Sequence, residues 1–164
     1  MIDVNPGDIL ISRVPWLRRR PSHCDNIAIV VPVFNELVIY EYTMSPRPAC
    51  VRTNRPEPAG VQMHRLSEWV EAVENPAIVA LRRPLYYEET DALLKTVEPA
   101  IHAGSPHGFG EDGDANQAHL PANFVAFVLQ QTGIFEAPAR RWSARALVKA
   151  LITEGIYDFP REID

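Results

Sequence analysis

Two eight-residue runs separated by two residues constrain the fold more than any other feature of the sequence. Asn26–Val33 and Glu36–Thr43 are rich in β-branched and aromatic residues, and Phe34-Asn35 lies between them. Such runs are typical of β-strands, and a two-residue connection between them is typical of a hairpin. We therefore predict an antiparallel hairpin at the centre of a sheet.

Shorter apolar segments extend this sheet on both sides of the hairpin. Gly7–Arg13 predicts a buried strand, and Val61–Arg65 and Ala77–Arg82 predict two short ones. Residues 45–60 are rich in proline and have no apolar period, which predicts a long loop. The first half of the chain therefore predicts a sheet.

Helical patterns follow. Ser67 is predicted to cap a short helix that runs through Glu74. A second helix places four apolar residues on one face: Leu93, Leu94, Val97 and Ile101. Pro99 should bend this helix or end it early, because proline lacks the N–H that a helix interior needs.

Two further helices complete the predicted fold. One starts near Pro121, ends at Gly133 and turns four residues inward: Phe124, Val125, Val128 and Leu129. The other is capped by Ser143, ends at Gly155 and packs through Leu147, Leu151 and Ile152. The predicted class is α+β, with a central antiparallel sheet or small barrel packed against about three helices.

Size and composition indicate one domain, residues 1–164. A chain of 164 residues with 46% hydrophobic residues can bury a real core. The sequence shows neither an apolar run of about 20 residues, which a membrane span needs, nor a basic apolar leader near Asp3 and Asp8. Two cysteines cannot form a disulfide framework. We expect a cytoplasmic or virion-associated protein with no signal peptide and no membrane span.

The charge balance argues against a nucleic-acid binder. The formal net charge is -5, whereas nucleic-acid-binding domains usually present a strongly basic face. Arg18, Arg19 and Arg20 form a local basic run. It is more often a solvated or partner-facing patch than an anion site.

Four short patterns occur in a characteristic order. They are Gly7-Asp8-Ile9-Leu10, Asn26-Ile27-Ala28-Ile29-Val30-Val31, Gly104-Ser105-Pro106-His107-Gly108-Phe109-Gly110 and Phe124-Val125-Ala126-Phe127-Val128-Leu129. Together they resemble the circularly permuted, papain-like NlpC-type superfamily of cysteine peptidases and amidases, which includes bacterial lipid-amide hydrolases and poxviral members. The resemblance spans nearly the whole chain and implies the permuted papain-like fold.

The resemblance also implies where a reactive pair would lie. In working members a histidine near the start of the second strand is the base, and a cysteine at the N-terminus of the late helix is the nucleophile. The helix N-terminus and the imidazole together stabilise the thiolate. Carried over, these positions hold Asn26 and Pro121. Neither side chain can do the family's chemistry.

The chemistry could have moved to neighbouring residues. Cys24 lies two residues before Asn26, and His119 lies two before Pro121. They could form an exchanged pair, although a strand thiol loses the help of the helix dipole. His23 could replace the missing histidine, but it would have no cysteine near Pro121 to activate. His107 is better explained by a turn than by catalysis.

Glu41 lies in the middle of an apolar strand and has two interpretations. Either it lines a cleft as a buried carboxylate that needs a donor, or Tyr40 and Tyr42 face the core and Glu41 faces solvent. His64 and His102 look like ordinary strand and helix positions, and we assign them no role.

The sequence predicts no metal and no cofactor. Asp112, Asp114 and Asn116 match the opening of a calcium loop. Gln117 and Asn123 stand where such a loop needs glycine and glutamate, so a surface loop is favoured.

Three functions remain in competition. The leading hypothesis is a non-catalytic binding or structural module, working with a protein partner or larger assembly in a viral or phage particle or at a cell envelope. The rival is an active thiol hydrolase using Cys24 and His119 on amides of peptidoglycan peptides or lipid-like substrates. The third is an anion-binding module that would use Arg13 together with Arg18, Arg19 and Arg20. Trp16 and Trp142 look exposed and compatible with partner surfaces.

Overall fold

The computed structural model describes residues 3–12, 26–43, 60–72, 78–81, 83–103, 120–136 and 140–163. Its described strands form one antiparallel sheet in the order β4-β3-β2-β1-β5-β6. Their bounds are β1 Ile9–Ser12, β2 Asn26–Val33, β3 Glu36–Thr43, β4 Gly60–Arg65, β5 Ile78–Leu81 and β6 Arg161–Glu162. The α+β class is confirmed, with a sheet and not a closed barrel over these strands. The proline-rich stretch 45–60 lies outside the described residues, except for Gly60.

The central hairpin has the predicted bounds. β2 and β3 pair from Ala28 with Glu41 to Val33 with Glu36. Phe34 occupies the turn with a φ of 54° and a fully exposed side chain. A positive φ is costly for a bulky residue, so the turn is held by the strands on either side. β6, only two residues long, was not predicted because so short a strand has no period to detect.

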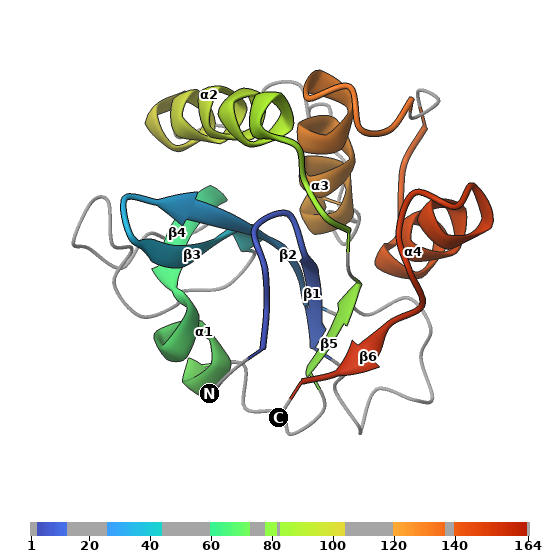
Figure 1. Ribbon diagram of the computed structural model, residues 1–164, viewed down its shortest axis with the longest axis horizontal. Helices are drawn as coiled ribbons and strands as arrows, with labels where there is room; N and C mark the ends of the chain where they lie inside the picture. Colours follow the sequence, from blue (N-terminus) through green and yellow to red (C-terminus); the bar gives the residue numbers. More distant parts are fainter. Residues whose placement is uncertain are drawn as a thin grey trace.

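Four described helices lie on the two faces of the sheet. They are α1 Leu66–Ala72, α2 Tyr87–Ala103, α3 Leu120–Gln131 and α4 Ala144–Thr153. Figure 1 shows α2 and α3 over one face, with α4 beside α3, and α1 on the opposite side. No helix among the described residues is long and apolar enough to cross a membrane.

Strand alternation separates two cores. Ile27 and Ile29 of β2 belong to the larger core, which includes residues of α2, α3 and α4. Ala28 and Val30 belong to the smaller core, which Trp69 of α1 completes. Because successive side chains of a strand point to opposite faces, this pattern follows from the sequence of β2 alone.

Two predicted helix ends are wrong. α2 does not end early at Pro99 but continues to Ala103, and the alternative of a bend at Pro99 stays a prediction. Proline removes one backbone donor, but packing of Leu93 and Val97, both 0% exposed, holds the helix on the sheet. Ser67 is not a cap, because α1 begins one residue earlier at Leu66.

The predictions for the last two helices are largely confirmed. The inward residues of α3 are all fully buried: Phe124, Val125, Val128 and Leu129. Gly133 follows α3 with a φ of 74° and Gly155 follows α4 with a φ of 68°. The Ser143 hydroxyl accepts a hydrogen bond from the Ala146 N–H at 3.1 Å, as a helix cap should.

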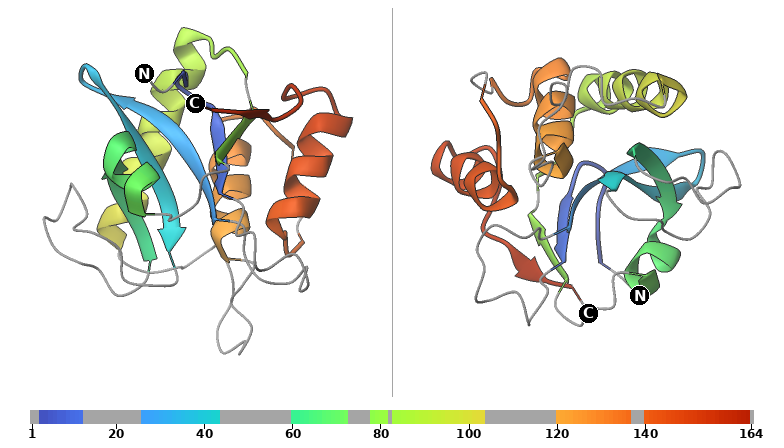
Figure 2. Two further views of the ribbon diagram at one scale, coloured as in Figure 1. Left: turned by 90° about the horizontal axis from the view of Figure 1, so that it is seen from below. Right: turned by 180° about the vertical axis from the view of Figure 1, so that it is seen from behind.

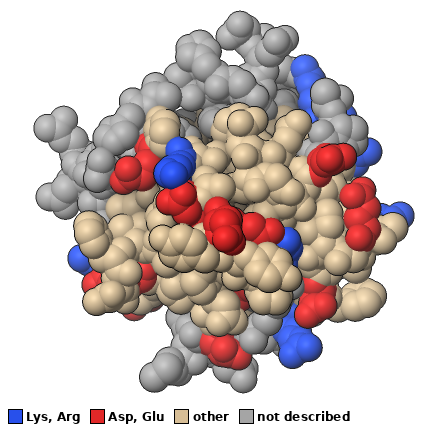
Figure 3. All heavy atoms as spheres, turned by 45° about the horizontal axis from the view of Figure 1, so that its top comes forward, with Lys and Arg blue, Asp and Glu red and all other residues tan. Residues whose placement is uncertain are grey.

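An ion pair fixes the start of α2. The Arg83 guanidinium donates two hydrogen bonds to the Glu89 carboxylate, at 2.7 and 2.8 Å. Glu89 also accepts a hydrogen bond from the Tyr86 N–H at 3.0 Å. Hydrogen bonding to Arg83 lowers the pKa of Glu89, partly offset by burial. Figure 3 shows that the surface around α2 is otherwise rich in carboxylates, which include those of Glu88, Asp91 and Glu98.

Glu89→Gln is expected to lower the free energy of unfolding by about 1 kcal/mol near neutral pH. The pKa of Glu89 is lower in the folded protein than its value of 4.5 in the unfolded chain. The stabilisation by the pair of Glu89 with Arg83 is therefore present above pH 4.5 and is lost as the pH falls below it. Urea unfolding from pH 7 to pH 3 should show the difference between wild type and variant shrinking toward acid. Glu88→Gln, the same change one residue earlier, is the control and should leave the acid dependence as in wild type.

Candidate functional site

The start of β2 and the start of α3 lie at the same end of the sheet. β1 ends at Ser12, which pairs with Asn26 at the start of β2, and β3 ends at Thr43, which pairs with Gly60 at the start of β4. α3 begins at this same end and contacts β2 and β3 (Figure 2, left view). The fold therefore gathers the start of the second strand and the start of the late helix.

The first turn of α3 contains a buried imino acid. Pro121 is the second residue of α3 and its side chain is buried. A first-turn N–H has no partner within a helix, so proline is well tolerated there. It provides no nucleophile. Pro121 therefore contributes packing at the start of α3 and no reactive side chain.

Asn26 is described here by its backbone alone. Its neighbours in β2 alternate, with Ile27 in the core beneath α3 and Ala28 in the core beneath α1. Asn26 pairs with Ser12 of β1 and lies two residues before Ala28 on β2.

Several predicted site residues lie outside the described part of the chain. These are Cys24, His119, His23, His107, and the arginines Arg13, Arg18, Arg19 and Arg20. Trp16 and the loop with Asp112, Asp114 and Asn116 lie outside it too. The exchanged pair and the anion site therefore stay predictions.

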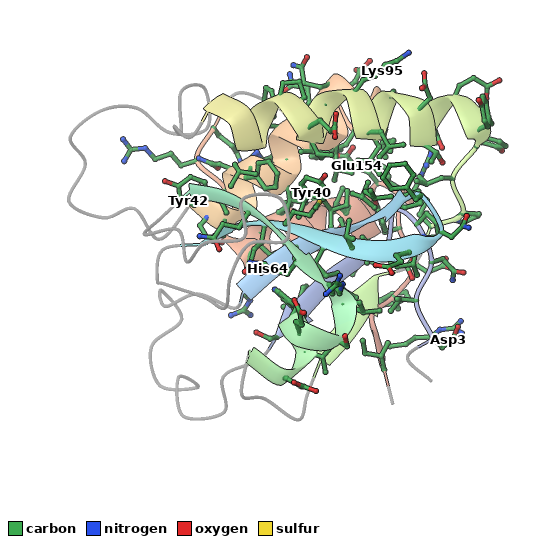
Figure 4. The ribbon with its side chains drawn as sticks, turned by 90° about the vertical axis from the view of Figure 1, so that its left-hand side faces the viewer. Asp3, Tyr40, Tyr42, His64, Lys95 and Glu154 are labelled. Carbon is green, nitrogen blue, oxygen red and sulfur yellow. The ribbon has the colours of Figure 1, made fainter. Side chains whose placement is uncertain are left out.

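Glu41 is buried and contacts a histidine. Tyr40 and Tyr42 point toward the helices, and His64 lies on the other side of the sheet (Figure 4). Glu41 is 1% exposed, so the interpretation that it faces solvent is wrong. Its Oε1 lies 3.5 Å from Nε2 of His64, which is 2% exposed. On the face of the sheet opposite α2 and α3, these two side chains are thus shielded from water.

Other polar side chains share this buried face. Gln62 pairs directly with Glu41, and Ser12 lies on β1 beyond Leu10. Both are 0% exposed. Ser12, Glu41, Gln62 and His64 are four of the five buried polar or charged residues among the described ones. Burying polar groups costs free energy unless each finds a hydrogen-bond partner, so these side chains must be paired within the fold.

The contact of His64 with Glu41 was not predicted from the sequence. His64 and Gln62 alternate with Met63 and Val61, which join the larger core. Because His64 pairs with Ile39, two residues from Glu41 on β3, the register brings the imidazole diagonally next to the carboxylate. The contact follows only from the pairing of β3 with β4, which the local sequence does not reveal.

The Gly7-Asp8 pattern has a structural explanation. Gly7 has a φ of 86°, and an added Cβ would lie 2.5 Å from the Leu85 side chain. The Asp8 carboxylate accepts a hydrogen bond from the Asn5 N–H at 2.8 Å. The hydroxyl of Tyr157, whose pKa is raised by burial, donates to the Gly7 carbonyl at 2.9 Å. This segment ties the C-terminal tail to the start of β1.

Asn123 joins α3 to the segment before α4. Its Oδ1 accepts a hydrogen bond from the Trp142 N–H at 2.7 Å. Trp142 is 4% exposed, so the prediction that it is exposed is wrong. Its ring packs edge-on against Phe135, with centroids 5.8 Å apart, and the Arg140 guanidinium lies 3.8 Å from its ring centroid.

Asn123→Ala is expected to lower the free energy of unfolding by about 1 kcal/mol, because the Trp142 N–H loses its acceptor. Chemical unfolding followed by tryptophan fluorescence measures this. Asn123→Asp keeps an acceptor oxygen and should lose less. Equal losses in the two variants would show that the hydrogen bond contributes nothing.

No family model, no curated protein and no solved structure matches this chain. Among the described residues, no group of three or more His, Cys, Asp or Glu side chains could hold a metal ion.

Proposed function

We propose that this protein is a non-catalytic, NlpC-like domain that works as a binding or structural module. The permuted papain-like architecture is part of this proposal, supported by an antiparallel sheet packed against a late helix that begins at the end where β2 starts. The single observation that carries the proposal is the buried Pro121 in the first turn of α3. An imino acid there removes the nucleophile while keeping the helix start.

The electrostatics of the described surface favour a partner other than nucleic acid. The net charge is -5, and α2 exposes Glu88 and Glu98 beside Asp91, whose carboxylate pairs with Lys95 at 2.6 Å. Such a surface repels phosphate backbones. A protein partner or larger assembly fits better, and a viral or phage particle or a cell envelope is the setting that the superfamily resemblance suggests.

The experiment measures turnover by the intact protein. A peptidoglycan stem peptide and a fatty-acyl amide are incubated with wild type, Cys24→Ser and His119→Ala. We expect no hydrolysis above buffer for any of the three proteins. Turnover by wild type that both substitutions abolish, with melting temperatures unchanged, would establish the active hydrolase instead.

A further inference from the structure

The large hydrophobic side chains that are exposed in the described part of the chain all lie at one end of the sheet. They are Phe34, Tyr86, Tyr87 and Phe159, and each is exposed by at least 73%. A single exposed aromatic residue is ordinary on a protein surface. Four such residues from three separate segments, gathered at one end, indicate an interaction surface, which we call the aromatic end.

The strand register places the three segments at this end. β2 turns into β3 at Phe34, at the end of the sheet where β1 begins. β5 finishes at the same end, because its last residue pairs with the first residue of β1, and Tyr86 and Tyr87 follow. β6 is antiparallel to β5 and therefore begins there, two residues after Phe159. The left view of Figure 2 shows the β2–β3 turn and the start of α2 at this end, and the start of α3 at the opposite one.

Phe34 is the clearest sign that these rings serve an interaction. It combines a φ of 54° with a fully exposed side chain. A positive φ strains a bulky residue, and a ring in water gains no packing energy, whereas asparagine or glycine would make such a turn at lower cost. Strained residues of this kind cluster at functional positions. Contact with a partner therefore explains the ring better than stability does.

Exposed carboxylates border the aromatic rings. Glu88 directly follows Tyr87, and Asp158 directly precedes Phe159. An aromatic face attracts a lysine or arginine cation that lies within about 6 Å of the ring centre, and a neighbouring carboxylate adds an ion pair. The side chains of the aromatic end therefore match the chemistry of a basic partner.

The cations at this end are largely engaged within the fold. Arg83 donates two hydrogen bonds to Glu89, and Nε of Arg65 lies 3.7 Å from Oε2 of Glu36. Arg161 is exposed and is one cation beside the two bordering carboxylates. An acidic excess repels anionic lipids and phosphate backbones, and a second copy would bring like charges together. Charge complementarity thus favours a basic protein segment.

We propose that the aromatic end binds a basic segment of a partner protein. Lysine or arginine side chains of that segment stack on the exposed rings and pair with Glu88 and Asp158. The inference rests on the proposed binding function and names the chemistry of the partner. Turnover decides whether the protein is catalytic and peptide binding decides this surface, so either proposal can fail while the other stands.

The first test measures binding of a fluorescein-labelled octa-arginine peptide by fluorescence anisotropy, with octa-glutamate as the control peptide. We expect wild type to bind octa-arginine and not octa-glutamate. The double variant Phe34→Asn with Tyr87→Ser should bind about fivefold more weakly, because two cation–π contacts are lost. Asparagine tolerates a positive φ, so the turn is kept. An unchanged affinity in this variant would overturn the proposal.

The second test compares two double variants that change the net charge equally. Glu88→Gln with Asp158→Asn removes the carboxylates of the aromatic end and should weaken octa-arginine binding about fivefold. Glu71→Gln with Glu98→Gln removes exposed carboxylates on α1 and late in α2, and should weaken binding less than about twofold. Equal losses of affinity would show that net charge alone attracts the peptide and would contradict the proposal.

Two further measurements address other occupants of the same rings. Wild type and the variant Phe34→Asn with Tyr87→Ser are compared by co-sedimentation with phosphatidylcholine vesicles, and by sedimentation velocity without vesicles. We expect neither protein to bind the vesicles or to dimerise. Vesicle binding or dimerisation by wild type that the variant loses would assign the aromatic end to a membrane or to a second copy, and the proposal would be wrong.

Discussion

Gly7→Ala is expected to lower the free energy of unfolding by about 3 kcal/mol. Two costs combine. An alanine at a φ of 86° is strained by about 1 to 2 kcal/mol. Its Cβ would also lie 2.5 Å from the Leu85 side chain, and overpacking of this kind costs at least about 1 kcal/mol. The melting temperature should fall by about 10 °C, measured by calorimetry.

Gly155→Ala is the matched control for this prediction. Gly155 also has a positive φ, 68°, but an added Cβ would meet nothing within 4 Å. It should lose only the strain part, about 1 kcal/mol. Equal losses of unfolding free energy at the two positions would mean that the close approach of Leu85 to Gly7 does not affect stability. The structural explanation of the Gly7-Asp8 pattern would then be wrong.

Phe124→Ala is expected to lower the free energy of unfolding by about 4 kcal/mol, because the ring is fully buried between α3 and the sheet. Phe127→Ala, on the same helix but only half-buried, should cost clearly less. Chemical unfolding of both variants measures the difference. Similar losses would contradict the described orientation of α3, in which Phe124 faces the core.

The hairpin and α3 could be predicted because their local patterns agree with their tertiary contacts. β2 and β3 have continuous β-branched and aromatic runs, and α3 combines proline at its start with glycine after its end. α2 shows the opposite case. Pro99 argues for a break, but the apolar face before it packs well enough for the helix to continue to Ala103.

The site was predicted less completely, for a physical reason. The assignment of Asn26 and Pro121 to the family positions depends on order and spacing along the chain, and it stays a prediction. The contact of Glu41 with His64 depends on which strands are neighbours and in which register, and local sequence does not encode this. The buried environment of Trp142 likewise depends on tertiary contacts, among them the packing of its ring against Phe135 and the hydrogen bond from its backbone N–H to Asn123, nineteen residues away.

The central claim is that no activated thiol exists, and the pH dependence of alkylation tests it most directly. Native protein is treated with iodoacetamide between pH 5.5 and 9.5, and modification of Cys24 and Cys50 is followed by peptide mass spectrometry. Our proposal predicts that both react as ordinary thiols or not at all, with rates rising only as the pH approaches the usual range near 8.5. Rapid alkylation of Cys24 at pH 6 that His119→Ala abolishes would contradict it.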